Sequence, residues 1–273
     1  MSSPAAGPGV QKRALSALLL ATGVSLATAA MILVNFLANA LPINGQTTGD
    51  VTRGYEVYFI PAGYAFSIWS LIYLGLVVYS VYLSLAVARG RGADSALAIA
   101  PWYLLTAVAN ACWLIAWHHN QFPLSMLLMV VLLAALIVIY RKLVVRPADS
   151  KFELWSVHIP FRIYLGWISV ATIANATITL DDAGWNGFGI AEPTWGVIMI
   201  AVATVLGLAM AFLHADAAYV AVVIWALVAV AVRLSDTTSI LVAALLGAVV
   251  LGLALVANLL RAPRGASRAG GHS

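Results

Sequence analysis

Apolar residues in this chain occur in eight long stretches, each long enough or nearly long enough to cross a lipid bilayer as a helix. They run over residues 14–41, 62–88, 95–117, 122–141, 155–179, 194–213, 217–233 and 238–260. The break at 214–216 is the least marked, and we place it there because residues 194–233 are about twice one bilayer crossing. The pattern predicts an all-α, polytopic membrane helical bundle with eight spans.

The first apolar stretch follows Lys12 and Arg13 and contains small residues at 27–29, as a cleavable signal peptide would. It continues to Leu41, which is too long for the apolar region of a signal peptide. We therefore expect an uncleaved first span, preceded by a cytoplasmic tail of residues 1–13.

Composition supports the membrane class. The 273 residues are 63% hydrophobic and 9% charged, with a mean hydropathy of +0.99, whereas soluble domains carry roughly 25% charged residues. The chain lies in the lipid bilayer, and its +4 net charge, spread over short loops, predicts no nucleic-acid partner. One cysteine excludes an internal disulfide and a multi-thiolate metal site, and we expect neither a metal nor catalytic residues.

Basic residues are distributed unevenly between the two sets of loops. Of the 14 Lys and Arg residues, the eleven on one side are Lys12, Arg13, Arg89, Arg91, Arg141, Lys142, Arg146, Lys151, Arg261, Arg264 and Arg268. The other side holds only Arg53 and Arg233, and Arg162 lies within a span. The positive-inside rule then predicts that both termini are cytoplasmic. We expect a multi-pass protein of the cell (plasma) membrane.

Four of the first five stretches carry aromatic and small polar residues along one helical face. These residues are Asn35 and Asn39; Phe66, Trp69 and Tyr73; Asn110 and Trp113; and Tyr164, Trp167, Ala171 and Asn175. Such groups have no role facing lipid, so they face a neighbouring helix or a cavity. Two interpretations remain open: helix packing with Asn as hydrogen-bonding glue, and a pocket for a flat, mostly apolar ligand.

The order of these motifs resembles the TspO/MBR family, the translocator or tryptophan-rich sensory proteins. The matching residues are Gly63, Tyr64, Phe66, Trp69, Leu71 and Tyr73; Asn110 and Trp113; and Tyr164, Trp167, Ser169, Val170, Ala171, Thr172 and Asn175. The resemblance covers about residues 14–180 and looks like a longer branch. It implies a five-helix core, a porphyrin or haem-like ligand without an obligatory cofactor, and a role as receptor or in transport. The family's Trp-rich first loop and its sterol-recognition pattern are absent.

The expected organisation is a five-helix domain over 14–182, a three-helix extension over 190–262 and a disordered tail over 263–273. Two stripes of small residues, Ala203, Gly207, Ala211 and Ala244, Ala248, Gly252, allow close helix packing. That packing is either within this chain or in a homodimer.

Other polar and aromatic residues have simpler interpretations. Arg162 in the fifth span shares a helical face with His158, so both could contact one anionic group, or Arg162 could extend to the membrane surface. Trp185 and Trp195 fall near span ends, which is typical of interfacial anchors. Asp216 is expected in a solvated turn.

The sequence favours an integral membrane protein that binds a flat hydrophobic small molecule, with tetrapyrroles favoured by the resemblance, for sensing or handling. A secondary transporter that uses the extra helices is one alternative. An enzyme that degrades the bound pigment is another.

Overall fold

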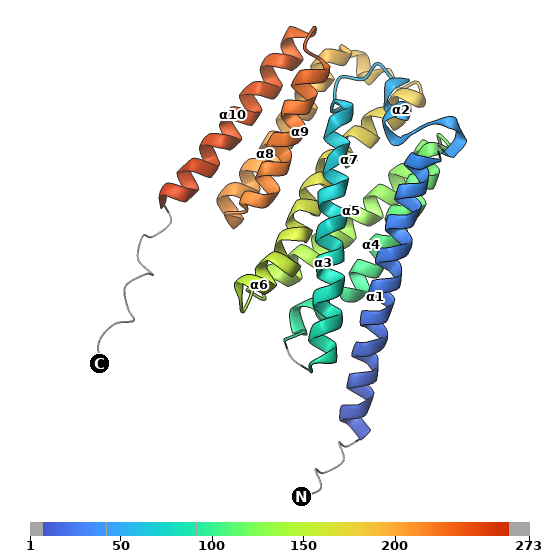
Figure 1. Cartoon of the computed structure of the whole chain (residues 1–273). Coiled ribbons are helices and arrows are strands. Elements are labelled where there is room, and N and C mark those ends of the chain that lie inside the picture. The colour runs from blue at the N-terminus through green and yellow to red at the C-terminus, as the bar shows by residue number, and fades with distance from the viewer. Residues whose placement is uncertain (1–7, 42, 91, 262–273) are drawn as a thin grey trace, which may run out of the picture.

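The computed structural model describes residues 8–41, 43–90 and 92–261, in which all regular structure is helical (Figure 1). The long helices are α1 (Pro8–Ala40), α3 (Ile68–Ala88), α4 (Asp94–His118), α5 (Phe122–Val144), α7 (Ile159–Asp182), α8 (Glu192–His214), α9 (Ala217–Arg233) and α10 (Thr238–Arg261). The short helices α2 (Thr48–Arg53) and α6 (Lys151–Glu153) lie in connections. Each predicted span is helical, which confirms the polytopic helical bundle. The expected tail over 263–273 lies outside the described residues.

Seven of these helices are long and apolar enough to cross a membrane, within the part of the chain that the structure describes. The eighth, α9, has 17 residues, about 26 Å at 1.5 Å per residue against a hydrocarbon core of about 30 Å. It packs against α7, α8 and α10, and its middle residues Ala226 and Leu227 are fully buried. Protein therefore covers much of this short helix.

The first five long helices form a closed ring. Contacts run from α1 to α4, then to α5, α7, α3 and back to α1. The last three helices pack on one another, and α9 attaches them to α7. At Gly166 of α7 a Cβ atom would lie 3.1 Å from both the Tyr219 carbonyl oxygen and the Val222 Cβ. One hydrophobic core includes residues of both 14–182 and 190–262, because α7 and α9 approach so closely.

The chain between α1 and α3 crosses over to the last three helices. It contains α2, then an extended segment, residues 54–62, that we call the strap. The Ala62 backbone N–H donates to the Ala229 carbonyl of α9 at 3.0 Å, and the Arg233 guanidinium donates to the Thr52 carbonyl at 3.0 Å. This connection therefore joins the two halves of the bundle.

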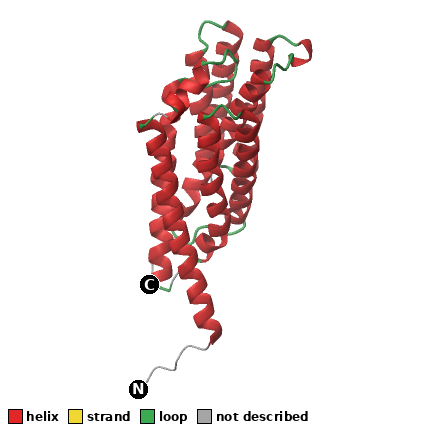
Figure 2. Cartoon of the chain, turned by 90° about the vertical axis from the view of Figure 1, so that its right-hand side faces the viewer, coloured by secondary structure: helices red, strands yellow, loops and turns green. Residues whose placement is uncertain are grey.

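The two ends of the bundle differ. The start of α1 and the end of α10 lie at one end, with α6, and α2 lies at the other (Figures 1 and 2). We call these the termini side and the α2 side. Their arrangement matches the even number of crossings expected from the sequence, and the cytoplasmic location of the termini stays a prediction.

One small-residue stripe packs within the chain. A Cβ atom on Gly207 of α8 would lie 2.7 Å from the Leu251 side chain of α10, and Ala203 and Ala211 are buried. Gly252 differs, since an added Cβ would meet no described atom within 4 Å. The α8 stripe thus lets α8 and α10 pack closely, and a homodimer stays a prediction.

Candidate functional site: an aromatic cluster inside the five-helix ring

Six of the predicted site residues meet in the interior of the ring. We call Phe66, Trp69, Tyr73, Trp113, Tyr164 and Trp167 the aromatic cluster. Its centre is Trp69, whose ring centroid lies 5.4 Å from Tyr73, 5.8 Å from Tyr164, 6.2 Å from Trp113 and 6.4 Å from Trp167. Phe66 packs edge-on against Trp167 at 5.7 Å.

Local helix geometry explains why these rings converge. Trp69 and Tyr73 are four residues apart on α3, so they lie on the same face and stack at an interplanar angle of 21°. Tyr164 and Trp167, three residues apart on α7, are likewise neighbours on one face, and both are buried. Pro61 and a 3₁₀ turn, η2 (Gly63–Ser67), precede α3 and bring Phe66 toward α7.

A hydrogen bond joins two of the predicted asparagines beside the cluster. The Asn35 amide of α1 donates to the Asn110 side-chain oxygen of α4 at 3.0 Å, and both residues are buried. The side chain of Asn39 lies outside the described residues. The hydroxyls of Tyr73 and Tyr164 lie near the Asn110 amide, but neither pair has the geometry of a hydrogen bond.

Five buried polar atoms of this region have no hydrogen-bond partner among the residues that the structure describes. They are the hydroxyls of Tyr73 and Tyr164, the Asn110 amide nitrogen, and the indole nitrogens of Trp113 and Trp167. A buried polar group without a partner costs about 1–3 kcal/mol. Such groups are rare in proteins, and several in one place need an explanation.

A small cavity adjoins the cluster. It measures about 30 Å³ and is lined by Trp69, Trp113 and Trp167, with Ala171 and Asn175 from α7. A volume of that size holds about one or two water molecules. Sites for drug-sized molecules measure about 300–1,000 Å³. The cluster therefore has to open before it can admit a large flat ligand.

The remaining asparagine of the prediction has its own partner. The Asn175 amide donates to the Ser125 hydroxyl of α5 at 3.2 Å, and the Thr179 hydroxyl donates to the Asn175 side-chain oxygen at 3.3 Å. Asn175 thus fastens α7 to α5 while it also borders the small cavity. Asn175 therefore lies near the cluster, but its side chain already bonds to Ser125 and Thr179.

Arg162 and His158 lie together at a different place, on the termini side. Both line a cavity of about 590 Å³ between α5, α6, α7 and the end of α8. A π-helical turn, η3 (Leu154–His158), precedes α7, and the His158 Nε2 atom is buried without a described partner. The structure thus brings the predicted pair together in one cavity. The anionic group that Arg162 contacts is a side chain of the protein itself.

That anion is Asp216, and its position corrects an expectation from the sequence. Asp216 is fully buried rather than solvated. Its Oδ2 lies 3.5 Å from the Arg162 Nε, and its Oδ1 accepts a hydrogen bond from the Tyr219 backbone N–H at 3.1 Å. The carboxylate both caps α9 and balances the Arg162 charge, which explains how an Arg is accommodated in α7.

Sequence reasoning also missed a cavity at the α2 side. Trp185 and Trp195, which we expected to be only interfacial anchors, line a space of about 540 Å³ between the end of α7 and the start of α8. Their ring centroids lie 5.1 Å apart. The available signal was a short segment that holds two Trp residues, three glycines and flanking carboxylates.

The comparison with protein families matches most of the chain. A family model described as TSPO-like protein matches residues 20–257. The match continues beyond residue 180, where the motif resemblance was expected to stop, and includes α8 and α9 and most of α10. No curated protein and no solved structure matches the chain. Because the family model covers both the five-helix ring and the last three helices, the chain belongs to the TSPO-like protein family.

Proposed function

We propose that this integral membrane protein binds a flat, mostly apolar small molecule at the aromatic cluster, for sensing or handling of that molecule. Tetrapyrroles are the favoured class because of the resemblance to the TspO/MBR proteins. The bound molecule lies between α3, α4 and α7, in contact with Trp69, Trp113 and Trp167.

The five unpaired polar atoms carry this proposal. Packing alone would favour Phe over Tyr at positions 73 and 164, since a buried hydroxyl without a partner lowers stability. A ligand with a few oxygen or nitrogen acceptors would pair with these hydroxyls and with the indole N–H groups. Apolar walls with a few polar groups are the usual composition of a small-molecule site.

The cavity volume adds a requirement to the proposal. A space of about 30 Å³ excludes a tetrapyrrole until the rings move apart. Trp69 lies nearly parallel to both Tyr73 and Trp113, with interplanar angles of 21° and 31°. A flat ligand can take the place of one of these rings by stacking on the exposed indole face, so binding restores the stacking that opening of the cluster removes.

Porphyrin titration of the purified protein tests the proposal. Loss of one stacking partner costs about 1–3 kcal/mol, so Trp69→Ala and Trp167→Ala should each weaken porphyrin binding by roughly 5- to 150-fold. Trp155→Ala is the control, because Trp155 is 66% exposed and lies outside the cluster. Equal affinity in all three variants, measured by the change in porphyrin absorbance, contradicts the proposal.

A second pair of variants separates binding from packing. Tyr73→Phe and Tyr164→Phe remove only an unpaired hydroxyl, so thermal stability should be unchanged or higher. If the hydroxyls bind the ligand, porphyrin affinity falls by roughly 2- to 10-fold, the equivalent of about one hydrogen bond. Unchanged affinity with raised stability would leave these tyrosines without a ligand role.

Transport is a second candidate, and one observation favours it. The carboxylate of Asp216 is buried beside Arg162, which lines the 590 Å³ cavity, and buried ionisable pairs in membrane helices often mark transport pathways. Proteoliposomes that carry the parent protein should then accumulate porphyrin, and Asp216→Asn should slow uptake without a change in porphyrin affinity. Uptake at the rate of empty liposomes argues against transport.

A further inference from the structure

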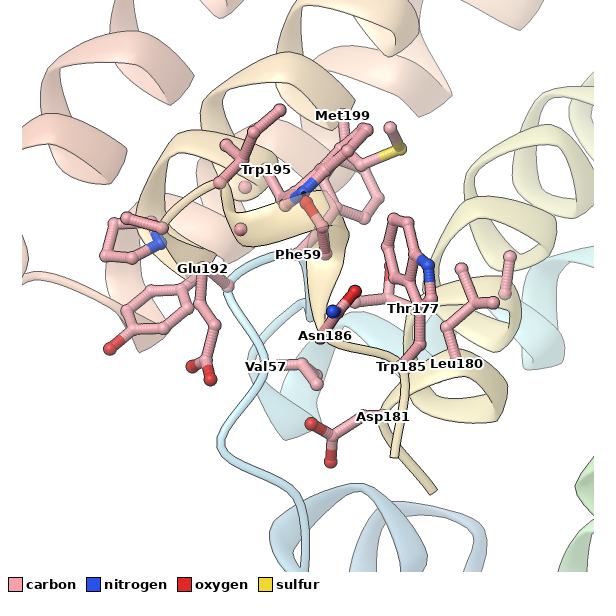
Figure 3. Close-up of a pocket in the computed structure, with 18 residues that line it drawn as sticks. Val57, Phe59, Thr177, Leu180, Asp181, Trp185, Asn186, Glu192, Trp195 and Met199 are labelled. Atoms are coloured by element: carbon pink, nitrogen blue, oxygen red, sulfur yellow. Dashed lines mark hydrogen bonds between the residues drawn. The ribbon is translucent and has the colours of Figure 1, made fainter. Parts of the chain in front are cut away.

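The cavity at the α2 side is separate from the aromatic cluster. The last turns of α7, the turn after it, the first turns of α8 and the strap enclose about 540 Å³ (Figure 3). Among the residues that the structure describes, none lines both this space and the small cavity beside the cluster. The strap separates them, with Phe59 facing this cavity and Ile60 the other. We call this space the α7–α8 cavity.

Two indoles form an aromatic wall that local structure holds in place. Trp185 and Trp195 contact each other at an interplanar angle of 52°. The Trp195 indole N–H donates to the Gly187 carbonyl at 2.9 Å. Gly187 has a φ of +62°, and a Cβ atom there would lie 2.9 Å from the Trp195 Nε1. Only glycine suits this position, so the turn and the Trp195 ring are fixed together.

The charged groups of the α7–α8 cavity all have one sign. Asp181 and Glu192 line it, and none of the described residues that line it is Lys or Arg. Within residues 8–41, 43–90 and 92–261 neither carboxylate forms an ion pair. Asp182 differs from its neighbour, since it accepts a hydrogen bond from the Tyr55 hydroxyl at 2.9 Å and does not line the cavity.

Figure 3 shows how the two kinds of group are arranged. The carboxylates of Asp181 and Glu192 lie toward one side of the pocket, and Trp195 and Met199 lie toward the other. Both acidic residues are exposed, so the cavity opens to the surface at the α2 side. A molecule inside it meets aromatic faces and negative charge together.

We propose that the α7–α8 cavity binds an organic cation with apolar or aromatic arms. Indole faces attract cations through the ring quadrupole, and the unpaired carboxylates of Asp181 and Glu192 supply opposite charge. The apolar arms fill the space against Leu180 and Met199. This site is additional to the proposed tetrapyrrole site and uses none of its residues.

Two hydrophobic ions of nearly the same shape and opposite charge test the proposal. Tetraphenylphosphonium and tetraphenylborate are titrated by calorimetry into the full-length protein in phosphatidylglycerol nanodiscs, and the heat of empty nanodiscs is subtracted. The cation should bind saturably, and the borate should not. Equal binding of both ions, or no saturable binding of the cation, overturns the proposal without any variant.

Charge-neutral variants locate the site. The double variant Asp181→Asn/Glu192→Gln should weaken phosphonium binding by roughly 2- to 30-fold, from two partly exposed charge contacts. Asp182→Asn is the matched control, because that carboxylate contacts Tyr55 instead. Equal affinity of the double variant and the parent protein, or an equal loss in Asp182→Asn, overturns the proposal. Porphyrin affinity should stay unchanged in both the double variant and Asp182→Asn.

A choline lipid headgroup carries the same cationic chemistry as a free amphiphile. Nanodiscs of phosphatidylcholine distinguish the two sources. If choline headgroups occupy the α7–α8 cavity, apparent phosphonium affinity falls in these discs relative to phosphatidylglycerol discs and the double variant removes the difference. If a free cation is the occupant, the change of lipid alters phosphonium affinity by the same factor in the parent protein and in the double variant, because the lipid charge acts on both alike.

Discussion

Removal of the Arg162 charge should destabilise the protein more than removal of the Asp216 charge. The Asp216 side chain is 0% exposed and the Arg162 side chain 26%. In Arg162→Met the buried carboxylate stays without its counterion. In Asp216→Asn the guanidinium borders a cavity of about 590 Å³ and can reach water there, while Asn keeps the cap of α9. Both variants break the same ion pair, but Arg162→Met should lower the free energy of unfolding more than Asp216→Asn does.

The magnitude follows from burial and distance. Breaking a buried ion pair by removing one partner costs about 3–5 kcal/mol. Here the Arg162 Nε lies 3.5 Å from the carboxylate, and the carboxylate keeps its bond to the Tyr219 N–H, so we expect about 2–3 kcal/mol for Arg162→Met. For Asp216→Asn we expect about 1 kcal/mol, and the double variant should lie within about 1 kcal/mol of the parent.

Equilibrium unfolding in mixed micelles of dodecyl maltoside and sodium dodecyl sulfate measures these free energies. The two single variants and the double variant form a thermodynamic cycle, and the expected coupling energy is about 3 kcal/mol. A coupling energy below about 0.5 kcal/mol would mean that the two charges do not interact in the folded protein. Our account of how α7 tolerates an arginine would then be wrong.

Three further predictions concern topology, the Tyr55 hydroxyl of the strap and a tight contact at a glycine. Reporter fusions at Gly92 and at the C-terminus should report the cytoplasm and a fusion at Gly45 the opposite side; a C-terminal signal outside would require an odd number of crossings. Burial of the Tyr55 hydroxyl, and then its hydrogen bond to the Asp182 carboxylate, raise the pKa of Tyr55 from 10.0 to about 12. The protonated hydroxyl therefore stabilises the fold below pH 10, and this contribution disappears as the pH rises toward 12, so the advantage of the parent over Tyr55→Phe in thermal unfolding should vanish in that window. Gly196→Ala should cost about 1–3 kcal/mol, because its Cβ would lie 2.5 Å from the nearest side-chain atom; Gly252→Ala, with no described atom within 4 Å, should be neutral or stabilising in the same unfolding assay.

The helices themselves were predictable from sequence, and for a definite reason. Lipid offers no hydrogen-bonding partner to the backbone, so each long apolar stretch has to be helical. Helical phase also placed Trp69 and Tyr73 on one face, and the structure brings them to the ring interior beside Trp167. Helical phase does not give the distance between aromatic rings on different helices. It therefore leaves open whether these rings enclose a large pocket or, as in the structure, pack onto one another around a cavity of about 30 Å³.

The misses came from contacts between residues far apart in the chain. Asp216 lies in a weak break in hydrophobicity, which is typical of an exposed turn, and only the position of α7 makes it a buried counterion. The cavity role of Trp195 depends in the same way on the strap, which reaches it from the first connection. Local pattern carries no information on such neighbours, so the termini-side and α2-side cavities both appeared only in three dimensions.

The bond between the strap and α9 has a consequence for biosynthesis. Ala62 leaves the ribosome long before Ala229, to which its N–H donates. At translation rates of about 5–20 residues per second, the earlier partner waits roughly ten to thirty seconds for the later one. During that time the strap lacks its contact with α9, whereas the residues before it already have their partners Trp117 and His118 in α4. We therefore expect the strap to reach its final position last, after α9 has entered the bilayer.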